Sequence, residues 1–158
     1  MTMLRLARDQ DAAFITEVWT RAENAMFLPP PDPGEVVEHI VLGHAFLWTA
    51  PDRPLGFATI NLWDPGNDGI SVIAMDRPGN GAGREFLSAL VDHLFADPGT
   101  NRVGLDTAAD NHRAMAVFAR LGFVAEGMFR ECWRRPDGLW VDCPHFSILR
   151  REWLARKG

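Results

Sequence analysis

The stretch from Ile70 to Phe86, ISVIAMDRPGNGAGREF, contains the strongest indications of the fold. A near-continuous apolar run, typical of a central strand, ends in three alternating glycines, Gly79, Gly81 and Gly83, and an amphipathic helix follows directly. Glycine allows successive backbone N–H groups to turn toward one point, and the first helical turn adds its own free N–H groups. The stretch therefore predicts a binding place for a phosphate or pyrophosphate.

The segments around this stretch indicate one α/β domain spanning residues 1–158. The strand at 70–75, the helix after the glycines and an apolar run at 102–106 form a strand–helix–strand unit, which implies a right-handed parallel crossover. The other runs pair as antiparallel hairpins. We therefore expect a mixed, mostly antiparallel sheet of six or seven strands with about four helices.

The element boundaries follow from hydrophobic periodicity and from turn residues. Helices are predicted after Asp9 or Asp11, from Pro33 onward, after the glycines up to 97–99, and over 111–121. Asp32 and Glu35 resemble a capping box at the start of the second helix. Strands are predicted at 3–7, 45–49, 55–63, 70–75, 102–106, 123–133 and 139–149.

Composition and charge narrow the functional classes. The formal net charge is −5, which argues against general nucleic-acid binding. The sequence has no apolar run long enough to span a membrane and no signal-peptide pattern, so we expect a cytoplasmic protein without a membrane partner. We interpret the basic cluster of the C-terminal third as a solvated face. Its members are Arg134, Arg135, Arg150, Arg151 and Arg156.

The cysteines and histidines do not predict a metal site. Cys132 and Cys143 lack metal-ligand spacing, and the five histidines show no ligand spacing on one helix face. A two-residue turn at Asp137-Gly138 would place Cys132 opposite Cys143 in a terminal hairpin. In a cytosolic sheet we expect both to be reduced thiols.

Two common phosphate-binding motifs do not match the glycine loop. The dinucleotide fingerprint Gly-x-Gly-x-x-Gly lacks its third glycine, because Phe86 stands three residues after Gly83. The nucleoside-triphosphate P-loop requires Gly-Lys-Ser/Thr, and Lys157 is the only lysine. On the loop alone, a structural turn with spare glycines remains an equal alternative.

A second pattern follows the loop along the chain. Asn111 begins a short amphipathic helix that closes in LGF at 121–123 and leads into a strand. Together with Gly81 and Gly83, this pattern resembles the GCN5-related N-acetyltransferase (GNAT) family, whose loop runs Arg/Gln-x-x-Gly-x-Gly/Ala after the fourth strand. The resemblance implies an acetyl-CoA-dependent acetyltransferase that uses no metal.

The resemblance also implies where the coenzyme binds. The pantetheine arm pairs like an extra strand with Ile73, Ala74 and Met75, where two parallel strands separate. Asn111 hydrogen-bonds the arm, although a helix cap is an alternative role for it. Phe118 on the short helix is expected to contact the coenzyme. The pyrophosphate lies on the N–H groups of Gly79, Gly81, Ala82, Gly83 and Arg84.

The sequence departs from the family pattern at two places. Pro78 stands where Arg or Gln is usual, and proline has no N–H to offer a phosphate. Ala114 and Phe118 occupy the positions of the usual Ser or Tyr acid, and the chain contains no tyrosine. No familiar general acid is therefore present, which leaves a coenzyme-binding or sensing module with little turnover as the alternative to an enzyme.

A carboxylate acting through water can still accept the proton of the attacking amine. The candidates are Asp68 and Asp76, which flank the central strand, and Asp142, which the resemblance places near the acceptor. We favour Asp142. The backbone N–H of Met75 is expected to polarise the thioester carbonyl, a role that needs no side chain.

The acceptor is expected to be a primary amine, on a small molecule or a protein N-terminus. The runs 126–130 and 149–153 look like the GNAT branch that acetylates N-terminal amines of ribosomal proteins or related small amines. A homodimer through the terminal strands is a further expectation from the family. Residues that could form the acceptor cleft, each with core packing as the alternative, are Trp19, Asn24, Phe27 and Trp133, then Trp63 and Trp140.

Overall fold

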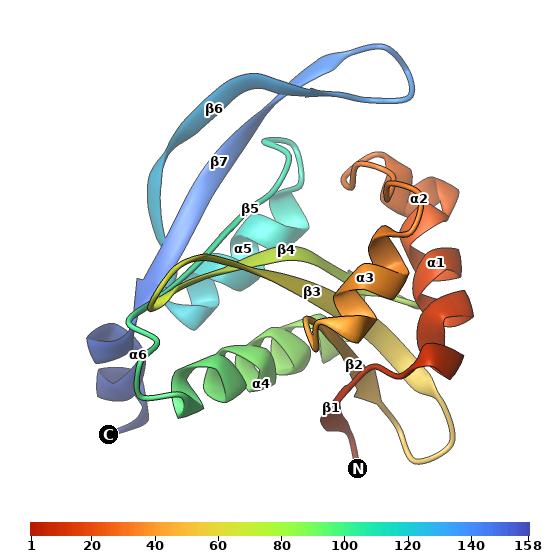
Figure 1. Cartoon of the computed structure of the whole chain (residues 1–158). Helices are drawn as coiled ribbons and strands as arrows, with labels where there is room; N and C mark the ends of the chain where they lie inside the picture. Colours follow the sequence, from red (N-terminus) through yellow and green to blue (C-terminus); the bar gives the residue numbers. More distant parts are fainter.

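Seven strands form one sheet in the order β1-β2-β3-β4-β5-β7-β6 (Figure 1). The computed structural model describes every residue from Met1 to Gly158. β4 and β5 run parallel, and every other neighbouring pair runs antiparallel, which confirms the predicted mixed sheet and its β-α-β crossover. The strands are β1 (Met3–Leu6), β2 (Ala45–Thr49), β3 (Pro54–Asp64), β4 (Asn67–Met75), β5 (Arg102–Asp106), β6 (Val124–Arg134) and β7 (Trp140–Leu149).

The chain contains more helices than the four predicted. The additional ones are α2, too short to show a helical period, and α6, which buries only Trp153. No helix is long and apolar enough to cross a membrane. The helices are η1 (Asp9–Asp11), α1 (Ala12–Thr20), α2 (Ala22–Ala25), α3 (Glu35–Val41), α4 (Ala82–Ala96), α5 (His112–Leu121) and α6 (Arg150–Lys157).

The start of α3 corrects one predicted boundary. The helix begins at Glu35 and not at Pro33, because Gly34 adopts a left-handed conformation with φ 85° that ends the preceding turn. One half of the predicted capping box is present, since a Glu35 carboxylate oxygen accepts the backbone N–H of Asp32 at 2.7 Å.

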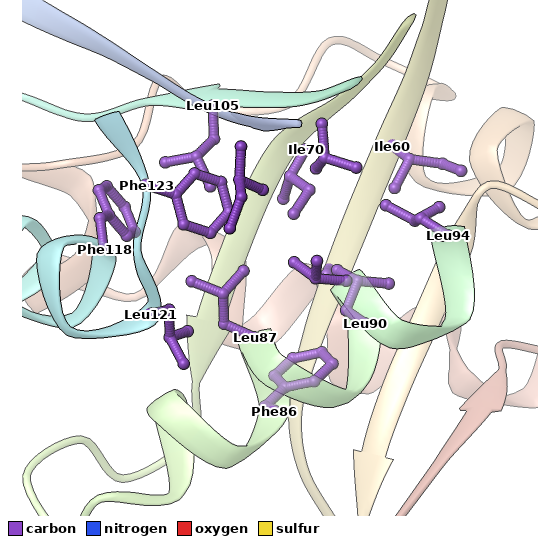
Figure 2. Close-up of a cluster of buried hydrophobic side chains, with 14 of the residues drawn as sticks. Ile60, Ile70, Phe86, Leu87, Leu90, Leu94, Leu105, Phe118, Leu121 and Phe123 are labelled. Atoms are coloured by element: carbon purple, nitrogen blue, oxygen red, sulfur yellow. The ribbon is translucent and has the colours of Figure 1, made fainter. Parts of the chain in front are cut away.

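Helices cover both faces of the sheet, but not equally. α4 and α5 pack their apolar sides on one face and form the main core, part of which Figure 2 shows. α1 and α3 pack on the other face, where the buried strand residues come from β2, β3 and β4 alone. β2 illustrates the alternation, because Phe46 and Trp48 join the first core and Ala45 and Leu47 the second. Strands β5 to β7 are left without a helix on the α1 side.

The β6–β7 hairpin extends beyond the rest of the sheet (Figure 1) and contains an irregularity that corrects the predicted cysteine pairing. The register shifts between Phe129 and Trp133, where Glu131 adopts a positive φ of 46°. Cys143 therefore pairs with Phe129, and Cys132 lies within the bulge. Both cysteines are free thiols, and burial raises the pKa of Cys143 to about 12.

Candidate active site

The glycine loop between β4 and α4 has the backbone geometry that the sequence predicted. Gly79 and Gly81 adopt φ angles of 108° and 83°, which other residues rarely adopt. The backbone N–H groups of Gly79, Gly81 and Gly83 have no acceptor within the protein. Three alternating residues thus present free donors at the positive end of a 15-residue helix, an arrangement suited to an anion.

The other two predicted donors of the loop are already engaged. The N–H of Ala82 bonds to the side-chain oxygen of Asn80 at 3.1 Å, and the N–H of Arg84 bonds to the carbonyl of Gly81 at 3.1 Å. The Asn80 contact is a common local turn, and an Asn two residues before the helix start was the signal for it in the sequence. The loop therefore presents fewer free N–H groups than the five expected.

Beside this loop, β4 has an open edge. β5 pairs with β4 only as far as Ile70, opposite Leu105, so Val72 to Met75 have no partner on that side. On the other side, the N–H of Asp76 bonds to Leu55 of the neighbouring chain segment. Because successive N–H groups of a strand point in opposite directions, those of Met75 and Ile73 point to the open edge and that of Ala74 toward β3.

Asn111 and Phe118 of the second motif have clear structural roles. Asn111 caps α5 by accepting the N–H of Ala114 at 3.3 Å, and it donates to the Thr107 hydroxyl at 3.0 Å. Phe118 is 4% exposed, packs against two other phenylalanine rings, and offers little surface to a coenzyme. The helix-cap role of Asn111 is therefore present, and one of its amide hydrogens is free for a ligand.

Each of the three carboxylates singled out from the sequence is held by other groups. Asp76 is paired with Arg21 at 2.9 Å and Arg53 at 3.4 Å, which anchors the end of β4. Asp68 is buried and accepts the Thr100 hydroxyl at 2.9 Å. One oxygen of Asp142 accepts the N–H of Glu131 at 2.7 Å and stabilises the β6 bulge.

A fourth carboxylate, Asp106, was missed by the sequence analysis. It ends β5 one residue after the last β4–β5 pair, so it lies where the two parallel strands separate. Asp106 is exposed and has no hydrogen-bond partner. Partial desolvation by neighbouring segments raises its pKa, against a smaller opposing influence from His145 across the β5–β7 ladder. Its only sequence signal was its position at the end of the strand after the crossover helix.

The tip of the β6–β7 hairpin joins the segment after α2 through Arg135. This guanidinium donates to the Met26 carbonyl at 2.7 Å, pairs with Asp110, and lies 5.7 Å from the Phe27 ring and 5.8 Å from the Trp133 ring. Arg135 is only 7% exposed, so the prediction of a solvated basic face was wrong for it. The structure thus brings two predicted acceptor residues, Phe27 and Trp133, around one buried cation.

Two more of the six predicted acceptor residues, Trp19 and Asn24, support the fold locally. Trp19 is 3% exposed, packs against Phe57, and donates from its indole N–H to the Pro29 carbonyl at 2.8 Å. Asn24 donates from its amide to the Val18 carbonyl at 2.6 Å. Both stabilise the α1–α2 region that carries Phe27.

Trp63 packs on the sheet face that lacks a helix, over β4 and β5. Its indole lies against two glycines. An added Cβ atom would lie 2.4 Å from the ring at Gly69 and 2.9 Å from it at Gly104. The ring centroid lies 5.8 Å from that of His145, whose other neighbour is Phe129 at 5.6 Å. An aromatic surface therefore lies beside Asp106, two residues beyond Gly104.

The loop, the open strand edge and the Asn111 helix together form an arrangement suited to a phosphate-bearing chain beside a split parallel strand pair. Comparison with known proteins agrees: the family described as Acetyltransferase (GNAT) domain matches residues 2–124. The chain belongs to the GNAT acetyltransferase family.

Individual relatives share only part of their sequence with this chain. It is 33% identical over 90 residues to YdaF of Bacillus subtilis (strain 168), which is provisionally named a ribosomal N-acetyltransferase. The match covers 54% of this chain and 46% of YdaF, less than half of that protein. It is also 35% identical over 77 residues to a kanamycin resistance protein of Rhizobium radiobacter, covering 48% of this chain and 68% of that protein.

Solved structures extend the likeness of fold to the whole chain. Aminoglycoside acetyltransferase AAC(6')-Ib in complex with coenzyme A superposes with a TM-score of 0.79 at 22% identity, over 100% of both chains. Spermidine N-acetyltransferase of Vibrio cholerae superposes with a TM-score of 0.82 at 20% identity, over 97% of this chain and 98% of that one. The seven-stranded sheet with its crossover is thus the fold of this family.

Proposed function

We propose that this protein transfers the acetyl group of acetyl-CoA to a primary amine by direct attack. The open edge of β4 beside three unpaired glycine N–H groups is the observation that carries the proposal. A pantetheine arm could pair with the free backbone groups of Ile73 and Met75, while the pyrophosphate lies on Gly79, Gly81 and Gly83. Asn111 could donate its remaining amide hydrogen to the arm.

In this proposal the chemistry is divided between backbone and carboxylate. The neutral amine attacks the thioester carbon, and the Met75 N–H stabilises the oxyanion that forms. The amine then loses a proton to Asp106, directly or through one water, and the carbon–sulfur bond breaks to release the CoA thiolate. Asp106 is a better base than Asp142 here, because both of its oxygens are unpaired and desolvation favours its protonated form.

The proposed acceptor is an amine that is positively charged in solution. It must lose a proton before its nitrogen can attack the thioester. Proteins with related sequence or fold are named for aminoglycosides, spermidine and ribosomal proteins, all of which carry primary amines. Phe27, Trp133 and Trp63 would supply the walls of the cleft, with Trp19 and Asn24 holding the α1–α2 side in place. Which of these amine classes is acetylated stays a prediction. The homodimer also stays a prediction.

A thiol-release assay tests the proposal. The protein is mixed with acetyl-CoA and, in turn, spermidine, kanamycin and a peptide with a free N-terminal alanine, and free CoA thiol is measured. Release with one of them supports the enzyme. Titration calorimetry with acetyl-CoA runs in parallel. Binding without release across pH 6–10 would favour the alternative, a coenzyme-binding module, and the absence of both would contradict the coenzyme site itself.

A further inference from the structure

The bulge of the β6–β7 hairpin brings the only two cysteines of the chain together. Cys132 has no partner in the β-ladder, but its thiol donates to the Val141 carbonyl at 3.7 Å, on the strand that carries Cys143 two residues later. The side chains of Cys132 and Cys143 lie close enough to share a hydrogen bond. The register shift therefore separates the two cysteines along the ladder and still leaves their thiols side by side.

The backbone holds the bulge that presents Cys132. Glu131 adopts its positive φ of 46°, and its N–H donates to an Asp142 carboxylate oxygen at 2.7 Å. Asp142 directly precedes Cys143, so this hydrogen bond joins the bulge to the part of β7 that carries the second thiol. Because the fold already holds the two thiols near each other, a bond between them needs little further ordering of the chain.

The two thiols differ in what can reach them. Cys132 is exposed, whereas Cys143 is only 7% exposed. Burial raises the pKa of Cys143 to about 12, and the hydrogen bond with Cys132 adds to the rise. The negative charges of Asp106 and Asp142 act in the same direction. Cys143 therefore stays a thiol near neutral pH, and a reagent from solution meets Cys132 first.

We propose that Cys132 and Cys143 form an oxidisable pair, which closes to a disulfide by exchange with a low-molecular-weight disulfide. The Cys132 thiolate attacks one sulfur of the small disulfide, so that a mixed disulfide forms and the first small thiolate leaves with the proton that Cys132 has lost. Cys143 then attacks the Cys132 sulfur and gives its proton to the second small thiolate as that leaves. The protein pair thereby loses two electrons and two protons, and the small disulfide becomes two thiols.

The disulfide would act on the tip of the hairpin. Trp133 directly follows Cys132, and Arg135 lies two residues beyond Trp133. A bond from Cys132 to Cys143 fixes the bulge of β6 to β7 at the base of this tip, where two hydrogen-bonded contacts hold it in the reduced chain. That the tip borders an acceptor site rests on the proposed function, but the formation of the disulfide does not.

Intact-mass spectrometry of the full chain, without acetyl-CoA, tests the proposal. After incubation with excess glutathione disulfide, the wild type should lose the mass of two hydrogen atoms, and dithiothreitol should restore it. Cys143→Ala should stop at the adduct of one glutathione on Cys132, and Cys143→Ser is the second variant should the smaller side chain loosen the hairpin. Cys132→Ala should react at least about tenfold more slowly than Cys143→Ala, because Cys143 is buried.

A second measurement follows the tip itself. Oxidation should shift the indole NMR signal of Trp133, assigned by its absence in Trp133→Phe, and Cys132→Ala should show no such shift. An unchanged signal in the oxidised chain would contradict the effect on the tip. The proposal is overturned if the wild type stops at the glutathione adduct, if it forms only a disulfide between two chains, or if neither thiol of the folded protein reacts. Acetyl transfer enters none of these measurements, so a failure of the proposed function would leave them unchanged.

Discussion

The coenzyme side and the acceptor side of this protein are built in contrasting ways. The proposed coenzyme seat uses backbone groups of residues that follow one another in the sequence, from the end of β4 through the glycines into α4. The acceptor side instead depends on side chains from distant segments, since Arg135 of the hairpin bonds to Met26, 109 residues earlier. In the proposed function, local backbone geometry would therefore bind the coenzyme, and a tertiary contact would shape the acceptor site.

The two sides should respond differently to amino-acid substitutions. Pro78 removes one backbone donor, but the free N–H groups of Gly79, Gly81 and Gly83 remain, because they do not depend on the side chain at position 78. The acceptor side is joined through one buried arginine, so we expect substitution of Arg135, Phe27 or Trp133 to alter its shape. We therefore expect substitutions on the coenzyme side to act on acetyl-CoA binding alone, and those at the hairpin tip to act on acceptor recognition.

The largest expected effect is at Asp106, at the point where β4 and β5 separate. Asp106→Asn should lower kcat by about 10²- to 10⁴-fold, the usual contribution of general acid–base catalysis. Because desolvation raises the pKa of Asp106, the wild-type rate should rise with pH as this carboxyl ionises, and the variant should lose that acidic limb. Rate–pH profiles with saturating acetyl-CoA measure both.

The same variant makes a prediction for stability. A carboxyl whose pKa is raised by folding destabilises the folded state at any pH above its unfolded pKa, so Asp106→Asn should not lower stability at pH 7. Asp142→Asn is the comparison. If that variant loses the activity and Asp106→Asn keeps it, the base is Asp142.

The second effect concerns the glycine loop. Gly83→Asp should weaken acetyl-CoA binding more than tenfold, because a carboxylate beside the pyrophosphate repels it. The melting temperature should not fall, since Gly83 has ordinary φ, an added Cβ would lie 3.6 Å from Met75, and an acidic residue suits a helix N-terminus. Calorimetry and thermal melts are the measurements, with Gly83→Ala as the uncharged control. Unchanged acetyl-CoA affinity in the Asp variant would show that the loop does not bind the pyrophosphate.

Arg135 should give a smaller and more selective effect. Arg135→Met removes the hydrogen bond to Met26 and the ion pair with Asp110. The free energy of unfolding should fall by on the order of 1–3 kcal/mol. We expect KM for the acceptor to rise about tenfold, with KM for acetyl-CoA unchanged. Arg134→Met, at an exposed neighbouring position, is the control. A parallel rise in both KM values would remove the distinction between the two regions.

The smallest effect is expected at Glu126, which ties β6 to β5 and β7. Hydrogen bonds from Arg102 and Ser147 lower the pKa of Glu126 from 4.5 to about 2. Its contribution to stability is therefore present above pH 4.5 and lost as the pH falls toward 2. Because the side chain is 39% exposed, Glu126→Gln should cost at most about 1 kcal/mol at pH 7 and almost nothing at pH 2.

Urea denaturation at the two pH values, with Glu23→Gln as an exposed control that lacks a partner, measures this difference. A loss at pH 7 well above that bound would show that Glu126 contributes more to stability than a surface ion pair does.

Short-range features were predictable because they arise from hydrogen bonds and periodicity within a few residues. The alternating glycines, the Asn111 cap and the order of strands around the crossover all follow from local rules. The boundary of α3 and the cysteine register were missed where one residue in a positive-φ conformation, Gly34 or Glu131, changed the local path.

By itself the sequence determined the α/β class, the glycine loop and the family, since each depends on residues close together along the chain. Only the tertiary structure decided that Asp106 lies at the split between β4 and β5 and that Arg135 is buried against Phe27 and Trp133. The physical reason is that burial and the loss of water around a charge depend on segments far apart in sequence, which only the packed chain brings together.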